Sequence, residues 1–320
     1  MTRVADQRVA APSAPPPVSR AGVEDQASSL RRLMDRVVPP MPRSDRPVIG
    51  PRPMMPLVAI ASGKGGVGKS TLAVNLAIGV SRTRPMVLVD ADLGTANADV
   101  LCGLAPTRRL DTELFRPGGP DLSALRIGTP WGFDLVPGTA GVAHAAQPDQ
   151  RLRDGFIRAL RTFGSPGEAV LVDLGAGIGA SVIETMASSD LGIVVTTPEP
   201  SALADAYALI KCVTRYRGDA RPIRMGLVVN MVDSRASGRA AHDRIDRVCR
   251  RFLGGSMPLL GLIRRDRRIG DSVRTRTPLL AGRPHGPAAR DLRRCAEFVA
   301  AITPRRGGGG SSGGCGGYRP

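Results

Sequence analysis

A chain of 320 residues, 42% of them hydrophobic, is long enough for one α/β domain with appendages. Its net charge of +17 would suit a nucleic acid or an anionic membrane, but only three of its 45 basic residues are lysines, so much of the charge reflects a general preference for arginine. The 3% aromatic content argues against stacking on exposed bases, and five cysteines without a C-x-x-C pair argue against a disulfide framework or a cysteine metal site. No apolar run is long enough to span a membrane and no secretory signal is recognisable, so we expect a cytoplasmic protein, at most peripheral at the inner face of the membrane.

The N-terminal part is rich in proline and divides into three segments. Residues 1–22 are expected to be disordered, residues 23–38 to form one amphipathic helix, and residues 39–55 to be a proline-rich linker. So short a helix is not stable alone in water. It therefore docks either on its own domain or in the groove of a partner protein, and the residues alone leave both possibilities open.

A phosphate-binding loop follows directly. Gly63, Gly68, Lys69 and Ser70 fit the pattern G-x-x-x-x-G-K-[ST], between an apolar run at 57–61 that predicts a strand and a helical pattern at 70–80. Backbone N–H groups of such a loop hold phosphates, Lys69 would reach the terminal phosphates, and the Ser70 hydroxyl would bind Mg²⁺. The expected nucleotide-binding residues of the loop are Gly63, Lys64, Gly65, Gly66, Val67, Gly68, Lys69, Ser70 and Thr71.

Two further expected strands end in aspartates. The strand at 85–90 leads into Asp90 and Asp92, and the strand at 168–173 ends in Asp173, which precedes a glycine-rich segment. Carboxylates at these strand ends lie where open α/β sheets bind ligands. We expect Asp92 to orient or deprotonate the attacking water, and Asp90 and Asp173 to hold Mg²⁺ through water. For the first two aspartates the alternative is a turn-forming role.

The remaining pattern alternates strands and helices. A hairpin is expected around 130–132, strands at 191–196, 223–230 and 258–263, and helices at 151–163, 201–213, 237–253, 267–274 and 287–302, with Ser201 as an N-cap. This alternation predicts an α/β fold with a mostly parallel, doubly wound sheet. The domain is expected over 56–304, followed by a flexible glycine-rich tail at 305–320. An apolar stripe on the last helix (Ala288, Leu292, Cys295, Val299 and Ile302) is of the kind that packs on a core.

The loop also carries a second lysine, Lys64. The stretch Lys64-Gly-Gly-Val-Gly-Lys69 resembles the deviant Walker A loop of the MinD/ParA family of P-loop NTPases (the SIMIBI type), in which the extra lysine reaches across a nucleotide-sandwich dimer. Residues 90–104, 197–211 and 228–232 closely resemble the FlhG (FleN) subfamily, which controls flagellar number and placement. Residues 25–31 resemble the motif by which that subfamily stimulates the flagellar GTPase FlhF. The resemblance covers residues 24–38 and 56–303.

The resemblance implies a slow, switch-type ATPase that forms a homodimer in its ATP state and uses ATP and Mg²⁺. Lys64, Lys69 and Asp92 would be catalytic, Ser70, Asp90 and Asp173 would hold the metal, and Asn230 would contact adenine, with a strand-end turn as the alternative for Asn230. The residues implied to bind an FlhF-like GTPase are Asp25, Gln26, Ala27, Leu30 and Arg31. Flagellar switch (C-ring) components or a flagellar transcription regulator are further implied partners. A glycine-rich tail stands where this subfamily carries a membrane-targeting helix, so the sequence gives no support for membrane association.

Two other classes within the superfamily are weighed against this interpretation. The charge favours a ParA- or MinD-type positioning ATPase that binds DNA or membrane in its ATP dimer, but residues 25–31 and 197–211 do not. An iron–sulfur carrier needs paired cysteines at the dimer face, and the sequence has no such pair.

Overall fold

The structure is a computed structural model that describes residues 55–114, 116, 119–139, 148–165, 167–217, 224–282 and 284–303. The predictions for the N-terminal segments, including partner-binding residues 25–31, and for the C-terminal tail lie outside these described residues.

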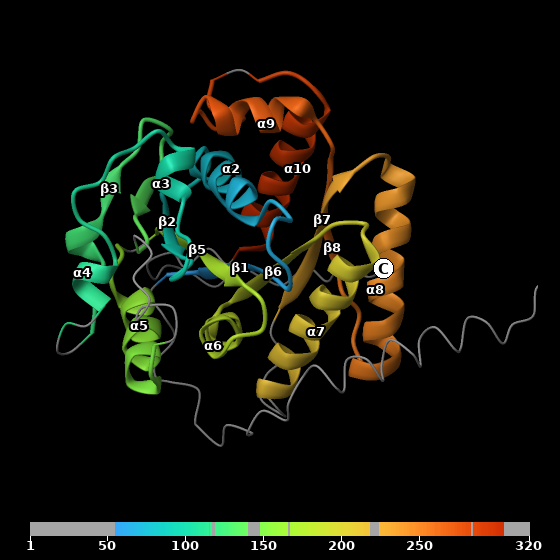
Figure 1. The fold of residues 1–320 in the computed structure, drawn as a ribbon, viewed down its shortest axis with the longest axis horizontal. Coiled ribbons are helices and arrows are strands. Elements are labelled where there is room, and N and C mark those ends of the chain that lie inside the picture. The colour runs from blue at the N-terminus through green and yellow to red at the C-terminus, as the bar shows by residue number, and fades with distance from the viewer. Residues whose placement is uncertain are drawn as a thin grey trace, which may run out of the picture. The chain divides into compact units, whose positions relative to one another are not determined.

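One eight-stranded sheet organises the part of the chain that the structure describes (Figure 1). The strand order is β3-β4-β2-β5-β1-β6-β7-β8, and every neighbouring pair is parallel except β3 with β4. The strands are β1 (Leu57–Ser62), β2 (Met86–Ala91), β3 (Ile127–Gly128), β4 (Asp134–Val136), β5 (Ala169–Ala176), β6 (Leu191–Thr196), β7 (Met225–Val232) and β8 (Leu259–Arg264). The predicted mostly parallel sheet is confirmed, and the expected hairpin is the antiparallel pair β3–β4.

Helices cover both faces of this sheet. α2, α9 and α10 lie on one side of it, and α5, α6, α7 and α8 lie on the other (Figure 1). The described helices are α2 (Lys69–Ser81), α3 (Ala98–Leu101), α4 (Asp111–Leu114), α5 (Gln150–Thr162), α6 (Ala180–Ser188), α7 (Pro200–Arg217), α8 (Arg235–Leu253), α9 (Arg267–Arg274) and α10 (Pro287–Ile302). Because both faces are covered, the central strands β1, β2 and β6 are buried along their whole length, as parallel sheets usually are.

The apolar stripe on α10 packs against the core. Ala288, Leu292, Cys295 and Val299 are at most 2% exposed and join the cluster around α2 and the sheet. The core-packing interpretation of this stripe is therefore confirmed.

Two of the differences from the sequence prediction concern α7 and α6. α7 begins at Pro200, so Ser201 lies inside the helix and the prediction that Ser201 is the N-cap is wrong. Proline is well suited to the first helical position because its missing N–H would have no partner there. α6 was not predicted, because residues 182–187 are all buried and such a helix shows no amphipathic period.

Candidate functional site

The site lies where two neighbouring strands lead to helices on opposite faces of the sheet. β1 leads into α2 on one side of the sheet, whereas the adjacent β5 leads into α6 on the other side (Figure 1). The register places Asp173 of β5 beside Ile60 of β1 and beside Asp90 of β2. The phosphate loop after β1 and the two aspartates therefore meet at the carboxyl edge of the sheet, where open α/β sheets bind ligands.

Two glycines of the loop lie against other elements with no room for a side chain. A Cβ on Gly63 would lie 2.1 Å from the carbonyl oxygen of Asp205 in α7. Gly68 has a φ of 82° at the N-cap of α2, and its Cβ would lie 2.4 Å from Nδ2 of Asn230. The loop is thus fixed between α7 and β7.

Lys69 and Asp173 form a buried ion pair beneath the loop. The Lys69 Nζ lies 2.5 Å from Oδ1 of Asp173 and 3.4 Å from the Ser70 hydroxyl. Burial raises the pKa of Asp173 above its ordinary value, although the Lys69 ammonium opposes that change. The other oxygen of this carboxylate, Oδ2, is buried and has no hydrogen-bond partner in the described part of the chain. An unpartnered buried oxygen beside a hydroxyl is a donor set that suits Mg²⁺, which prefers oxygen ligands.

Asp90 lies next to this pair and fixes the start of the following loop. Its Oδ2 accepts hydrogen bonds from the backbone N–H groups of Asn97 (2.9 Å) and Ala98 (2.8 Å), and its Oδ1 accepts one from Asp92 (3.2 Å). Burial and the negative charge of Asp173 raise the pKa of Asp90 from 3.8 to about 7, against the opposing effects of these hydrogen bonds and of Lys69.

Asp92 is only half-buried and faces the glycine segment that follows Asp173. Its Oδ1 accepts hydrogen bonds from the N–H groups of Thr95 (3.0 Å) and Gly94 (3.3 Å), and lies 3.6 Å from the position of a Cβ on Gly175. Asp90 and Asp92 therefore both shape the turn, and the structure also brings them together with Lys69 and Asp173.

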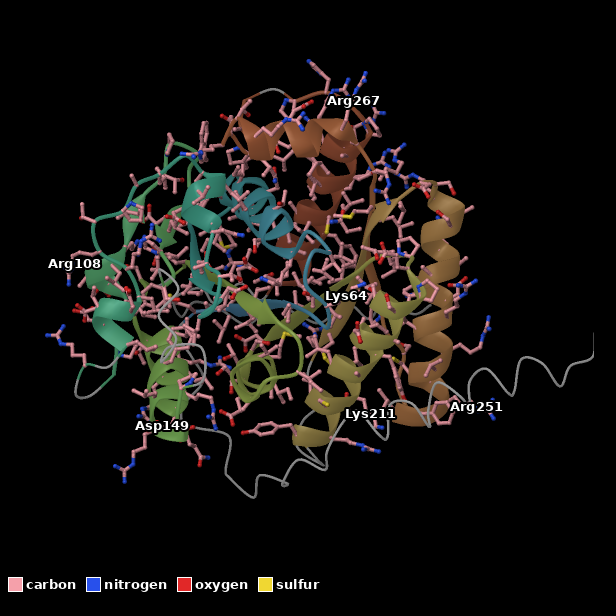
Figure 2. All side chains as sticks on the ribbon, viewed as in Figure 1. Lys64, Arg108, Asp149, Lys211, Arg251 and Arg267 are labelled. Atoms are coloured by element: carbon pink, nitrogen blue, oxygen red, sulfur yellow. The ribbon has the colours of Figure 1, made fainter. Side chains whose placement is uncertain are left out.

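Lys64 lies on the outside of the loop, beside α7 (Figure 2). Its Nζ donates to the Ser201 hydroxyl at 3.1 Å and to the Glu199 carboxylate at 3.5 Å, and its side chain is 44% exposed. An exposed ion pair of this kind contributes about 0–1 kcal/mol, so little free energy opposes its rearrangement.

Asn230 lies within β7 rather than in a turn, and it adjoins a large cavity. Its amide donates to the carbonyl of Val67 at 2.8 Å, which fixes the side chain against the phosphate loop. The cavity has a volume of about 510 Å³ and is lined by the start of α2, by Asn230 and Met231, by residues 263–267 and by α9. This volume lies in the range of small-molecule pockets. Met231 has a φ of 55°, a strained backbone conformation of the kind that often occurs at binding sites.

The sequence analysis did not predict that the end of β8 forms a wall of this cavity. Arg264 donates from Nε and Nη2 to both carboxylate oxygens of Asp291 in α10, at 2.7 and 2.9 Å. Asp291 is 4% exposed, so this bidentate pair fixes the cavity wall. The rule that ligands bind at the carboxyl ends of parallel strands, applied to β8 as well as β7, could have pointed to these residues.

Comparisons with known proteins agree with this geometry. The family model of the CobQ/CobB/MinD/ParA nucleotide-binding domain matches residues 58–279. The antiactivator FleN of Pseudomonas aeruginosa is 32% identical over 244 residues, which cover 76% of this chain and 85% of FleN. The flagellum site-determining protein YlxH of Helicobacter pylori is 33% identical over 228 residues, which cover 68% of this chain and 73% of YlxH. The chain belongs to the FlhG (FleN) family of MinD/ParA ATPases.

A solved structure extends this family relation to the fold. The septum site-determining protein MinD of Pyrococcus horikoshii, determined in complex with Mg-ADP, superposes with a TM-score of 0.64 at 25% identity, covering 79% of this chain and 99% of that one. This FlhG-family chain is accordingly a nucleotide-binding ATPase with the MinD/ParA fold.

A cluster of His, Cys, Asp and Glu ligands and a membrane-spanning helix are both absent from the described ranges of this FlhG-family chain. Those ranges contain no group of three or more His, Cys, Asp or Glu side chains that could hold a metal ion, and Cys102, Cys212, Cys249 and Cys295 are buried and unpaired. No helix among the described residues is both long and apolar enough to cross a membrane.

The raised pKa of Asp90 predicts how the stability of the nucleotide-free protein depends on pH. The native state binds this proton more tightly than the unfolded chain, so stability should fall as the pH rises from 3.8 to about 7. Asp90→Asn keeps one oxygen for the Asn97 and Ala98 amides and cannot titrate, so it should flatten this slope and stabilise the protein above neutral pH. Urea unfolding at pH values of about 5 and 8 measures both effects. The prediction would be contradicted if the unfolding free energy changed equally between these two pH values in the wild type and in the variant.

Proposed function

We propose that this FlhG-family ATPase is a cytoplasmic switch that dimerises with ATP, hydrolyses it slowly and thereby regulates the number or placement of flagella. The observation that carries the proposal is Lys64, a second lysine in the phosphate loop whose side chain is exposed and held by one weak ion pair and one hydroxyl. Such a lysine is available to the phosphates of a second copy. The similarity to FleN and to the flagellum site-determining YlxH supports the flagellar part.

In this proposal ATP occupies the loop and the adjoining cavity. Lys69 exchanges Asp173 for the terminal phosphates, while the cavity beside Asn230 takes the adenine and ribose. Ser70 would hold Mg²⁺ directly, and Asp90 and Asp173 would hold it through water. When bound, Mg²⁺ neutralises charge on the β- and γ-phosphate oxygens.

Asp92 is assigned to hydrolysis. Its carboxylate is half-exposed at the edge of the site, where it can orient a water molecule and take a proton from it. Both of its hydrogen bonds from the backbone N–H groups of Gly94 and Thr95 go to Oδ1, so Oδ2 can serve this water without the loss of either bond.

Light scattering tests the switch directly. With ATP, an Asp92→Ala variant that retains the nucleotide is expected to run as a dimer, and with ADP as a monomer. A monomer in both nucleotide states would exclude the dimerising switch.

A more specific prediction is that the N-terminal segment stimulates an FlhF-like GTPase. A peptide of residues 1–40 and the full chain are both expected to accelerate GTP hydrolysis by the cell's FlhF-like protein. Gln26→Ala combined with Leu30→Asp should abolish this effect, because it removes one polar and one apolar group of the predicted binding face. ATP hydrolysis by the same full-length variant, which should be unchanged, is the control. If the peptide is inert and deletion of the segment unfolds the ATPase domain, the segment instead stabilises its own domain.

A second candidate, non-specific DNA binding by the ATP dimer, is favoured by one observation. α8 exposes Arg239, Arg244, Arg247, Arg250 and Arg251. Fluorescence anisotropy with a DNA duplex, with and without ATP over a range of salt concentrations, distinguishes the candidates, since binding through phosphates weakens steeply with salt.

A further inference from the structure

The loop that carries Asp92 is held mainly by its own hydrogen bonds. Asp90 accepts from the N–H groups of Asp92, Asn97 and Ala98, and Asp92 accepts from those of Gly94 and Thr95. These bonds close the turn locally, but they do not fix it against a neighbouring strand. Within the described residues, a single hydrogen bond ties residues 92–96 to another segment.

That bond comes from Thr139. Its Oγ1 donates to the carbonyl of Leu93, the residue after Asp92, at 2.8 Å, and Thr139 is 1% exposed. Thr139 lies just beyond β4, which pairs in parallel with β2, so the carboxyl ends of the two strands lie side by side. The N–H of Leu110 donates to the carbonyl of Pro137 at 3.0 Å and so also holds the segment that contains Thr139.

The neighbouring Gly138 shows how closely this segment approaches the loop. A Cβ at Gly138 would lie 2.4 Å from Cβ of Ala96 and 2.7 Å from the carbonyl oxygen of Asp90. Any side chain there would displace the loop at both ends. Residues 137–139 therefore pack closely against the turn, and within the described ranges Thr139 supplies the hydrogen bond between them and the backbone beside Asp92.

We propose that Thr139 is a positioning residue for ATP hydrolysis: its hydroxyl fixes the backbone at Leu93 and thereby the direction of the Asp92 carboxylate. The inference rests on the role proposed above for Asp92. Because the hydroxyl is buried, its loss leaves the Leu93 carbonyl without a partner, and the turn then gains freedom that the local bonds do not remove. Small displacements of a positioned group are costly in rate, whereas the phosphate loop and the cavity stay intact.

Matched substitutions at one position test this. Thr139→Val keeps the shape and removes the hydroxyl, and it should lower kcat about tenfold at saturating ATP with KM and nucleotide affinity unchanged. Thr139→Ser restores the hydroxyl and should retain most of the wild-type kcat. Thr139→Ala provides a second variant without the hydroxyl in case valine disturbs folding, and thermal unfolding of all three checks integrity. A wild-type kcat in folded Val and Ala variants would overturn the proposal.

A double variant separates this inference from the proposal on which it depends. If Thr139 acts through Asp92, then Asp92→Ala combined with Thr139→Val should hydrolyse ATP no more slowly than Asp92→Ala alone. Multiplied losses in the double variant would mean that Thr139 acts on something else, and would sink the inference while leaving Asp92 in place. Wild-type turnover of Asp92→Ala by itself would remove the role of Asp92, and the inference with it.

Discussion

Lys64→Ala is expected to abolish the ATP-dependent dimer while the monomer still binds ATP. The Lys64 side chain is exposed and its Nζ donates to Glu199 and Ser201 of the α7 segment, so its removal should leave the nucleotide pocket of its own subunit intact. Lys69→Ala is expected to lose the nucleotide itself, by about 10- to 100-fold in affinity, since a charge-assisted contact to the phosphates disappears. It also leaves Asp173 buried without its cation.

Light scattering with ATP and equilibrium binding of a fluorescent nucleotide measure these two effects separately. Lys64→Arg is the matched control, because it keeps the charge but replaces a compact ammonium by a planar guanidinium. We expect it to fail as alanine does, in accord with a chain that uses arginine almost everywhere else. Loss of ATP binding in Lys64→Ala would show that Lys64 acts within its own subunit, contrary to the dimer model.

Asp92→Ala is expected to bind Mg·ATP normally and to hydrolyse it at least about tenfold more slowly, because a positioned general base contributes about 10²- to 10⁴-fold to the rate. Asp92→Asn is the informative comparison. Its amide oxygen can still accept from the N–H groups of Gly94 and Thr95, so the turn keeps its shape while the negative charge is lost.

Phosphate release under saturating ATP measures both variants. Slow turnover in both would assign the effect to the carboxylate, whereas slow turnover in the alanine variant alone would assign it to the shape of the turn. Normal turnover in both would move the hydrolytic role to another group.

The elements recognisable in the sequence are those with a strong local signal. The phosphate loop is a contiguous pattern, the buried strands are short apolar runs, and α9 and α10 were predicted with the bounds that the structure gives. α6 was not recognisable, because both its faces are buried and its sequence shows no period.

The site itself could be predicted only in part, because much of it is assembled from distant segments. Asp90 and Asp173 could be identified by their place at strand ends, and the sheet order then brings them together. The wall at Arg264 and the hydrogen bond from Thr139 to Leu93 join residues far apart in the chain. No local pattern marks such contacts, since they depend on which strands become neighbours.

The approach of Gly63 to α7 has a mechanical consequence. The two backbones touch without an intervening side chain, so no rotamer change can take up a displacement between them. A shift of the loop at Gly63 must therefore be shared by the helix, which continues from Asp205 to Arg217. The close approach at Gly63 thus couples the position of the nucleotide loop to the position of α7.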